Sequence, residues 1–294
     1  MDAPLYVIVL NWNGERVIGP CLASLARVNG PALRVIVVDN ASTDRSLEIV
    51  RRDFPEVELL VNKENLLFAA GNNVGLERAL AEGAERMLLL NNDTEVHPDF
   101  ARRLTAAMER DPRAGIVGAK IFYYDDPKRV WYGGGGFWPL IGVPRHVNIR
   151  RLDGTFHERT GETGYVTGCA MLVRREVVEQ IGLLDPSYRM YSEDVDFCLR
   201  AARAGWKCLY EPSAVVWHKV SSSSGGGLTP YKLENRVAST HRLLSRFKPL
   251  WWRVLLFPVH LAAFVVLLVA LLFTGRWPLF AAALRGAVRA ARGE

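Results

Sequence analysis

Short apolar runs alternate with longer amphipathic stretches through the first 110 residues of the chain. Each apolar run has the length of a strand, and each is followed by a stretch long enough for a helix. We expect strands at 5–10, 33–38, 57–61 and 87–90, and helices at 14–28, 44–52, 72–82 and 98–110. Runs that are apolar on both faces suit parallel strands covered by helices on both sides. The pattern therefore predicts an α/β fold with a Rossmann-like, mostly parallel central sheet flanked by helices.

The pattern is less regular between residues 110 and 220. We expect strands at 116–121, 165–167, 171–173, 207–210 and 214–217, and a helix at 193–204. Residues 122–165 are rich in glycine and aromatic side chains and are expected to form an excursion over the functional site. Residues 1–220 are then one domain, and the polar residues 221–230 follow it as a flexible linker or lid.

Residues 231–294 predict a helical tail that contacts a membrane. A basic helix at 231–248 precedes the uncharged segment 254–273, and about twenty such residues are needed to cross a bilayer. The flanking aromatic residues resemble those found at membrane interfaces, although two residues interrupt the apolar run. The flanking residues are Trp251, Trp252 and Trp277, and the interruptions are Pro258 and His260. A soluble helical subdomain or a dimer interface remains as an alternative, and a surface-lying or re-entrant segment is as compatible with the charges as a span.

The last short helix of the tail has an interfacial pattern. Its basic residues Arg285, Arg289 and Arg292 fall on one face, and the rest of the helix is almost entirely apolar. A helix of this kind lies in the plane of a membrane surface, with its basic residues at the lipid headgroups.

The charge distribution agrees with a lipid partner and excludes a nucleic-acid partner. The chain has 37 basic and 31 acidic residues, a net charge of +6. Ten of the basic residues but only two acidic residues lie in the tail, so the tail carries +8 and the remaining chain −2. Positive charge interleaved with long apolar runs is typical of segments that meet anionic lipids.

The cysteines and the first residues indicate a cytoplasmic protein. Four cysteines occur without a C-x-x-C pair or metal-ligand spacing, as expected of reduced, buried thiols. The chain enters its first predicted strand with no secretory signal. The predicted domain is therefore expected at the cytoplasmic face of the cell (inner) membrane.

Polar side chains follow three of the predicted strands, at 11–14, 39–44 and 91–95. Ligands of open α/β sheets bind at the carboxyl ends of the strands, so these segments are the first candidates for a site. Asp39 is placed to accept hydrogen bonds from a base or a ribose, whereas Ser42 or Thr43 is expected to cap the next helix. Asp93 offers a hard oxygen ligand for Mg²⁺ or Mn²⁺, unless it only forms a turn with Thr94.

A second group of titratable residues lies near 193–218. Glu193, Asp194 and Asp196 open a predicted helix, where they complement the helix dipole or supply a general base of raised pKa. His218 ends a predicted strand and is either structural or a metal ligand close to Asp93.

Seven segments together resemble family 2 glycosyltransferases of the GT-A fold, in the rhamnosyltransferase-like branch that builds bacterial surface polysaccharides. The segments are VIVLNWNG (7–14), VVDNASTD (37–44), FAAGNNVG (68–75), LLNND (89–93), GCAMLVRR (168–175), SEDVDFCLR (192–200) and WH (217–218). Two departures stand out. The metal motif reads Asn91-Asn92-Asp93, so that either His218 or Glu95 has to assist Asp93. Leu67 stands where the family often has glycine.

The resemblance implies a role for each matching residue. The nucleotide-sugar would be bound by Leu10, Asn11, Asn13, Asp39, Asn72 and Asn92. Asp93 and His218 would hold Mg²⁺ or Mn²⁺, and Asp194 would be the general base beside Glu193. Residues 122–165 would meet the acceptor, with Trp131, Tyr132, Trp138 and His146 as candidate contacts.

The expected function is inverting transfer of a sugar, with rhamnose as the first candidate, from a nucleoside-diphosphate sugar to a hydroxyl of a glycan or lipid-linked glycan. The nearest alternative is a polyprenyl-phosphate glycosyltransferase, but a phosphate acceptor needs little general base. A membrane scaffold that binds nucleotide-sugar without turnover is a third hypothesis. A sugar nucleotidyltransferase ranks lowest, because no Gly-rich loop with Arg and Lys follows the first predicted strand.

Overall fold

The computed structural model describes residues 3–156, 158–220 and 227–293. Its first half has the predicted βαβ organisation, with four parallel strands in the order β4-β1-β2-β3. The strands are β1 (Leu5–Asn11), β2 (Leu33–Asp39), β3 (Glu58–Val61) and β4 (Arg86–Asn91). The helices are α1 (Ile18–Leu25), α2 (Ser46–Asp53), α3 (Leu67–Ala81) and α4 (Phe100–Glu109). The predicted α/β fold is confirmed.

The second half extends this sheet with strands of both directions. β11 (Ala170–Arg174) lies antiparallel between β4 and β6 (Ala114–Tyr123), and β12 (Lys207–His218) is parallel to β6. The short strands β5 (Thr94–Val96), β7 (Val130–Tyr132) and β10 (Gly161–Glu162) pair with β12 or β6. The sheet is therefore mixed, although most pairs of neighbouring long strands are parallel.

One strand prediction of this half was wrong, and two predicted strands are continuous with each other. Residues 165–167 are not in a strand, because they lead into a turn that starts β11. The predicted strands 207–210 and 214–217 are one strand, β12, whose pairing with β6 shifts between Glu211 and Val215. The remaining elements of this half are the helices α5 (Arg175–Ile181) and α6 (Glu193–Arg203), and the hairpin of β8 (Gly135–Phe137) and β9 (Pro144–His146).

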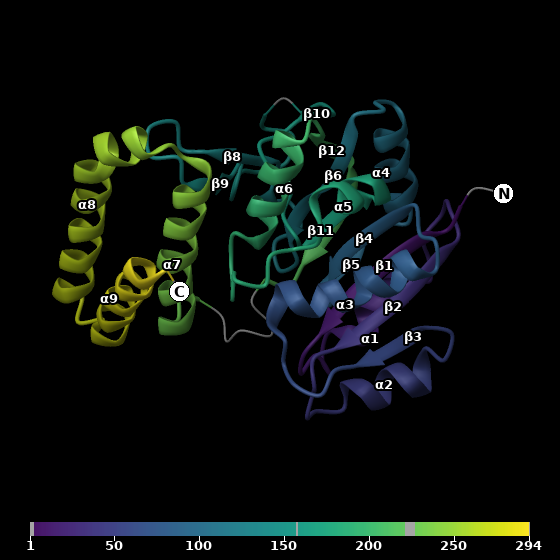
Figure 1. Cartoon of the computed structure of the whole chain (residues 1–294). Coiled ribbons are helices and arrows are strands. Elements are labelled where there is room, and N and C mark those ends of the chain that lie inside the picture. The colour runs from purple at the N-terminus through teal and green to yellow at the C-terminus, as the bar shows by residue number, and fades with distance from the viewer. Residues whose placement is uncertain (1–2, 157, 221–226, 294) are drawn as a thin grey trace.

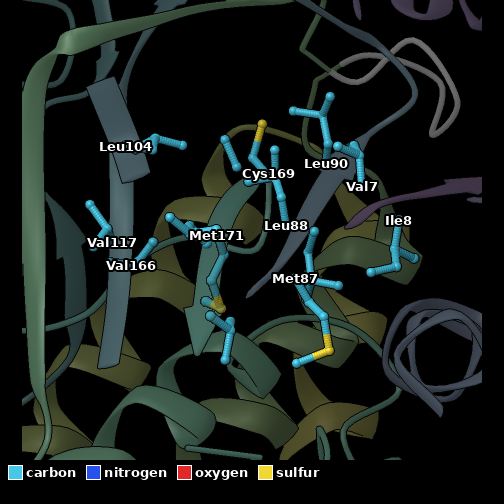
Figure 2. Packing of buried hydrophobic residues seen from close by; sticks show 14 of the residues in the cluster. Val7, Ile8, Met87, Leu88, Leu90, Leu104, Val117, Val166, Cys169 and Met171 are labelled. Atoms are coloured by element: carbon cyan, nitrogen blue, oxygen red, sulfur yellow. The ribbon is translucent and has the colours of Figure 1, made fainter. Parts of the chain in front are cut away.

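The central strands are buried on both faces. Figure 2 shows Met87, Leu88, Leu90 and Met171 packed within this core, and all four are at most 2% exposed. Helix α3 packs so closely that a Cβ on Gly75 would lie 2.5 Å from the side chain of Ile8. This packing of helix on sheet fixes the carboxyl ends of the strands, where the polar segments lie.

The tail forms three helices beside the sheet (Figure 1): α7 (Pro230–Phe247), α8 (Leu250–Phe273) and α9 (Trp277–Arg292). Helix α7 lies against the sheet domain, and α8 lies on the side of α7 that faces away from the sheet. Helix α8 is long and apolar enough to cross a membrane: its most apolar stretch of 18 residues has a mean hydropathy of 2.8, and only 11% of that stretch is buried. The predicted linker or lid falls mostly on residues 221–226, which lie outside the described residues.

The basic residues of α9 make contacts within the protein that the sequence pattern did not predict. Arg285 and Arg289 both pair with Glu234 of α7, at 2.9 and 3.5 Å. A Cβ on Gly286 would lie 2.6 Å from the main-chain oxygen of Glu234, so the two helices are in close contact. The two arginines share one carboxylate of α7, and Arg285 remains 56% exposed.

Candidate active site

Asn11 connects the carboxyl ends of three parallel strands. Its side-chain amide donates to Asp39 Oδ1 at 2.8 Å and to Ser46 Oγ at 3.0 Å. Its Oδ1 accepts from Asn92 Nδ2 at 2.7 Å. Asn11, Asp39 and Asn92 are all buried, so this network holds the ends of β1, β2 and β4 in one fixed polar surface.

Asp39 forms the turn after β2. Its carboxylate accepts from the main-chain N–H of Ser42 at 2.8 Å and from the Ser42 hydroxyl at 2.6 Å. The capping prediction for Ser42 or Thr43 is wrong. The N-cap of α2 is Arg45, and the first-turn amide of Ser46 is satisfied by Asp44 at 3.0 Å. Asp39 is 0% exposed, and its carboxylate is engaged by Asn11 and by this turn.

The other predicted nucleotide residues surround this network. The backbone of Asn13 is left-handed at φ 48°, and its Oδ1 accepts from the Thr43 N–H at 2.8 Å. Leu10 lies under α3, where a Cβ on Gly71 would be 2.6 Å from its side chain. Asn72 is buried and donates to the Phe68 carbonyl of its own helix at 2.9 Å. The structure thus brings the 11–14 and 39–44 segments together and leaves Asn72 bonded within α3.

Leu67, the departure noted in the sequence, has φ 63° at the start of α3. A left-handed backbone favours glycine, which has no Cβ to crowd the following carbonyl. This explains why the family often places glycine here, and it shows that the turn is kept without one.

Asp93 and His218 form the second part of the site. His218 Nε2 lies 3.0 Å from Asp93 Oδ1, and both side chains are buried. The pairing of β5 with β12 fixes this contact, because His218 is opposite Thr94 and the Lys219 N–H donates to the Asp93 carbonyl at 2.8 Å. Glu95, the alternative partner, instead pairs with Lys219 at 2.9 Å.

This pair fits a divalent ion that also binds substrate. Carboxylate oxygen and imidazole nitrogen are both ligands of Mn²⁺, and Mg²⁺ takes few protein ligands beside substrate phosphates. Ligands at about 2.1 Å from an octahedral ion lie about 3 Å apart when adjacent, similar to the Asp93–His218 separation. No cluster of three or more His, Cys, Asp or Glu side chains suited to a metal occurs in the described ranges. The pair is therefore a partial ligand set.

The surroundings of His218 favour its charged form in the absence of an ion. Burial opposes a positive charge, but the carboxylate of Asp93 beside it raises the pKa of His218 well above its ordinary value. Burial also raises the pKa of the Cys169 thiol. Trp131 closes the other side, with its ring edge-on to His218 at 4.7 Å.

Asp194 and Glu193 lie at the first turn of α6. Asp194 accepts from the Gly168 N–H at 2.9 Å and from the Val195 N–H at 2.8 Å. Glu193 is buried, and its Oε2 makes no hydrogen bond to any described residue. Burial, together with the charge of Asp194, raises the pKa of Glu193 to about 8, and burial also raises the pKa of Asp194.

The Gly168-Cys169 dipeptide connects Asp194 with the Asp93–His218 pair. Gly168 donates to Asp194, and the next residue, Cys169, contacts His218. Tyr191 and Ser192, just before α6, both have left-handed backbones, at φ 70° and 67°. Consecutive non-glycine residues in this region are strained, and such strain is found where the surrounding structure holds a functional side chain in place.

Asp196, the third acid of the cluster, belongs to a different network. It is 0% exposed and pairs with Arg200 at 2.7 Å and with Arg246 of α7 at 2.9 Å. Arg246 also pairs with Asp185 at 2.7 Å. Sequence reasoning missed Arg246, because its charge was counted with a membrane tail. The structure uses that charge inside the protein.

The aromatic residues predicted to meet the acceptor divide into two groups. Trp131, Tyr132 and His146 form a cluster beside His218, and burial lowers the pKa of His146 to about 4. Tyr132 is fully buried and donates to the Tyr165 carbonyl at 2.6 Å, so it packs behind this cluster and is not available to a ligand. Trp138 is 51% exposed at the tip of the β8–β9 hairpin, away from this cluster.

Comparison with known proteins identifies the family. The profile described as glycosyltransferase-like family 2 matches residues 3–237. The chain belongs to glycosyltransferase family 2. It is therefore a glycosyltransferase, in agreement with the predicted enzyme class.

Two relatives illustrate where this glycosyltransferase lies within the family. It is 31% identical to the N-acetylglucosaminyl-diphospho-decaprenol L-rhamnosyltransferase of Mycobacterium tuberculosis, with 79% of this chain and 81% of the relative covered. It is 22% identical to the dTDP-rhamnosyl transferase RfbF of Shigella flexneri, with 76% and 72% covered. The predicted resemblance to the rhamnosyltransferase-like branch is thus confirmed.

Solved structures support the GT-A-like fold. A structure of GalNAc-T7 with UDP, GalNAc and Mn²⁺ superposes with a TM-score of 0.63 at 16% identity, over 83% of this chain and 48% of that one. The 1–349 fragment of TarS from S. aureus in complex with UDP gives a TM-score of 0.54 at 19% identity, over 81% and 64%.

Proposed function

We propose that this glycosyltransferase moves a deoxyhexose, with L-rhamnose as the first candidate, from a nucleoside-diphosphate sugar to a hydroxyl of a lipid-linked glycan. The reaction inverts the anomeric centre and takes place at the cytoplasmic face of the membrane. One observation carries the proposal: the Gly168-Cys169 dipeptide separates an acid pair of raised pKa from a buried Asp–His pair. The names of the two bacterial relatives support the sugar and the acceptor class.

Asp194 is the proposed general base. As the acceptor oxygen attacks the anomeric carbon, Asp194 takes the proton of the acceptor hydroxyl, and the bond from that carbon to the diphosphate breaks. The Gly168 N–H fixes one carboxylate oxygen at 2.9 Å. A raised pKa brings the affinity of the carboxylate for a proton closer to that needed near neutral pH.

Asp93 and His218 are proposed to hold Mg²⁺ or Mn²⁺. Such an ion, when bound with the donor, neutralises the charge that develops on the leaving diphosphate. The fixed β5–β12 pairing keeps both side chains oriented toward the same point, so little reorganisation is needed. Trp131 covers His218 and limits the access of water to it.

The polar ends of β1, β2 and β4 are proposed to bind the nucleotide. Leu10, Asn11, Asn13, Asp39, Asn72 and Asn92 line this region or hold its turns. Since their hydrogen bonds are largely made to one another, the surface is formed before the donor arrives, which lowers the entropic cost of binding.

The membrane location is proposed from α8. Only 11% of its most apolar stretch of 18 residues is buried, and its exposed side chains include Trp251, Phe257 and Val266. An exposed apolar surface of this kind marks a membrane or protein contact.

The closest alternative is transfer to a polyprenyl phosphate. A phosphate oxygen is already ionised and needs no base, whereas this site places two carboxylates of raised pKa together. The carboxylate pair supports a hydroxyl acceptor. A scaffold without turnover would release no nucleotide, so donor consumption in the presence of Mn²⁺ separates that hypothesis from an enzyme.

The decisive experiment compares wild type with Asp194→Asn over a panel of nucleotide-sugars. We expect one donor to raise the unfolding temperature in a metal-dependent way for both proteins. Only the wild type should then transfer the sugar, with turnover of the variant reduced by a factor of about 10³ or more. Turnover near wild type in Asp194→Asn would show that another group is the base.

A further inference from the structure

The β8–β9 hairpin tip packs against the junction of α7 and α8. Gly142, at φ 65°, lies so close that a Cβ there would be 3.0 Å from Lys248 and 3.3 Å from Trp252. The Ile141 carbonyl lies 3.1 Å from His260 Nε2 of α8. The tip therefore belongs to the same surface as the start of the apolar helix.

Large apolar side chains on this surface are exposed together. Trp138 and Leu140 of the tip are 51% and 62% exposed, and Leu250 and Trp251 of α8 are both 66% exposed. Exposed tryptophan and leucine beside an apolar helix are typical of protein surfaces that enter the headgroup region of a bilayer.

An apolar cavity of about 320 Å³ lies beneath the tip, between α6 and α7. Its wall is formed by aromatic and aliphatic side chains, chiefly Phe137, Leu199, Leu243, Leu244 and Phe247. The volume falls in the range of ligand sites, which are usually apolar with a few polar groups at fixed positions.

The polar groups of this cavity are two cations, Arg203 and Lys248. Arg203 lies over the Phe247 ring at 4.4 Å, and Lys248 lies over the Trp252 ring at 5.2 Å. In the described part of the chain neither cation forms an ion pair with a carboxylate, and Arg203 Nη2 donates to the carbonyls of Arg246 and Phe247 at 3.4 and 3.3 Å. An anionic group would therefore complement the cavity in charge.

We propose that this cavity binds one anionic phospholipid of the bilayer. Its acyl chain lies along Leu199, Leu243 and Phe247, and its phosphate binds Arg203 and Lys248 at the rim. The exposed tip and the start of α8 place the cavity mouth at the depth of the headgroups. The inference rests on the proposed membrane location and on no step of sugar transfer, so loss of lipid binding would leave the proposed transfer reaction untouched.

The test uses the full chain in detergent and measures its unfolding temperature with added short-chain phosphatidylglycerol or phosphatidylcholine. We expect phosphatidylglycerol to raise the unfolding temperature saturably and phosphatidylcholine to do so far less. Arg203→Gln combined with Lys248→Gln should weaken phosphatidylglycerol binding about thirtyfold, since each cation near an anionic headgroup contributes about fivefold. Lys63→Gln combined with Arg110→Gln, an equal charge change at exposed positions elsewhere, should have no effect.

A second variant tests the cavity without changing charge. Ala202 lies exposed at its wall, so Ala202→Phe fills part of the space and should abolish the phosphatidylglycerol effect, whereas Ala81→Phe on α3 should not. Equal stabilisation by both lipids, or a phosphatidylglycerol effect retained in Ala202→Phe and in the double variant, would overturn the proposal. Stabilisation by a polyprenyl phosphate but not by phosphatidylglycerol would also overturn it and assign the cavity to an acceptor lipid.

Discussion

At the scale of single residues, the site separates carboxylates that look equivalent in sequence. Glu193, Asp194 and Asp196 lie within four positions, yet two face the candidate site and the third is bound to two arginines. The partners of the three carboxylates differ. Asp194 accepts from the Gly168 N–H, one Glu193 oxygen accepts no hydrogen bond from a described residue, and Asp196 pairs with guanidinium groups. Such partners come from distant elements and could not be found from local sequence.

Removing the carboxylate of Asp93 tests the proposed metal pair. Asp93→Asn should lower kcat/KM by a factor of about 10²–10³, because charge on the leaving group would lose its stabilisation. The Mn²⁺ concentration needed for half-maximal activity should also rise. Glu95→Gln is the matched control, since Glu95 pairs with Lys219 and should remain near wild type. If the two variants had equal effects, Asp93 would have no special role.

The buried Glu193 predicts how stability changes with pH. Its folded pKa is about 8, above the ordinary value of 4.5, so the folded state holds the proton more tightly than the unfolded state. The stability that the folded state gains from holding this proton is fully present below about pH 4.5 and is lost as the pH rises toward 8. Glu193→Gln should therefore raise the unfolding free energy at pH 8.5 relative to wild type by about 1–3 kcal/mol, with a smaller gain at pH 6.

Thermal or urea unfolding at both pH values measures this difference. Glu77→Gln, at an exposed position of α3, removes the same charge and should leave the pH profile unchanged. A Glu193→Gln profile parallel to that of wild type would mean that Glu193 titrates normally.

The left-handed backbone of Leu67 can be tested by comparing glycine and alanine at this position. Leu67→Gly and Leu67→Ala remove the same packing apart from one methyl group, but only glycine adopts φ 63° without strain. We expect the glycine variant to be more stable than the alanine variant by about 1 kcal/mol, the reverse of the usual order at a helix position. Urea unfolding of both variants decides the order, and a more stable alanine variant would contradict the strain argument.

At the scale of elements, α7 contacts the segment that leads into α6. Ser239 Oγ donates to the Met190 carbonyl at 2.8 Å, and Arg236 lies over the Tyr191 ring at 5.0 Å. Arg246 adds its pairs with Asp185 and Asp196. These contacts extend from Arg236 to Arg246 and pack the segment before α6 against α7.

Arg246→Met should therefore destabilise the fold. The carboxylate of Asp196 is 0% exposed and would keep only Arg200 as a charged partner, which we expect to cost on the order of 2 kcal/mol. Arg285→Met breaks a more exposed pair with Glu234 on the same helix bundle and should cost less than about 1 kcal/mol. Denaturant unfolding of both variants tests the difference, and equal losses would show that the Asp196 network is not special.

At the scale of the whole molecule, the sequence predicted the parallel strands and their helices because both depend on local periodicity. It also predicted the site segments, because the carboxyl ends of parallel strands meet at one edge. The antiparallel insertion of β11 between β4 and β6 was not predictable in this way, since its partners lie far along the chain. For the same reason the basic residues of α7 were assigned to lipid, although several bind the catalytic domain.

The position of α7 changes where the enzyme can be divided. A chain that ends near residue 229 would lack Ser239 and Arg246. The carboxylates of Asp185 and Asp196 would then lose their partner on α7. A chain that ends at Lys248 would keep α7 and its contacts with the sheet domain and remove both α8 and α9, so we expect it to fold without detergent. Expression of the two truncations followed by circular dichroism and donor-binding measurements tests this, and a well-folded, donor-binding 1–229 chain would contradict it. A soluble enzyme for crystallisation or inhibitor screening is thus best obtained by cutting at the α7–α8 junction, about twenty residues beyond the boundary that composition suggests.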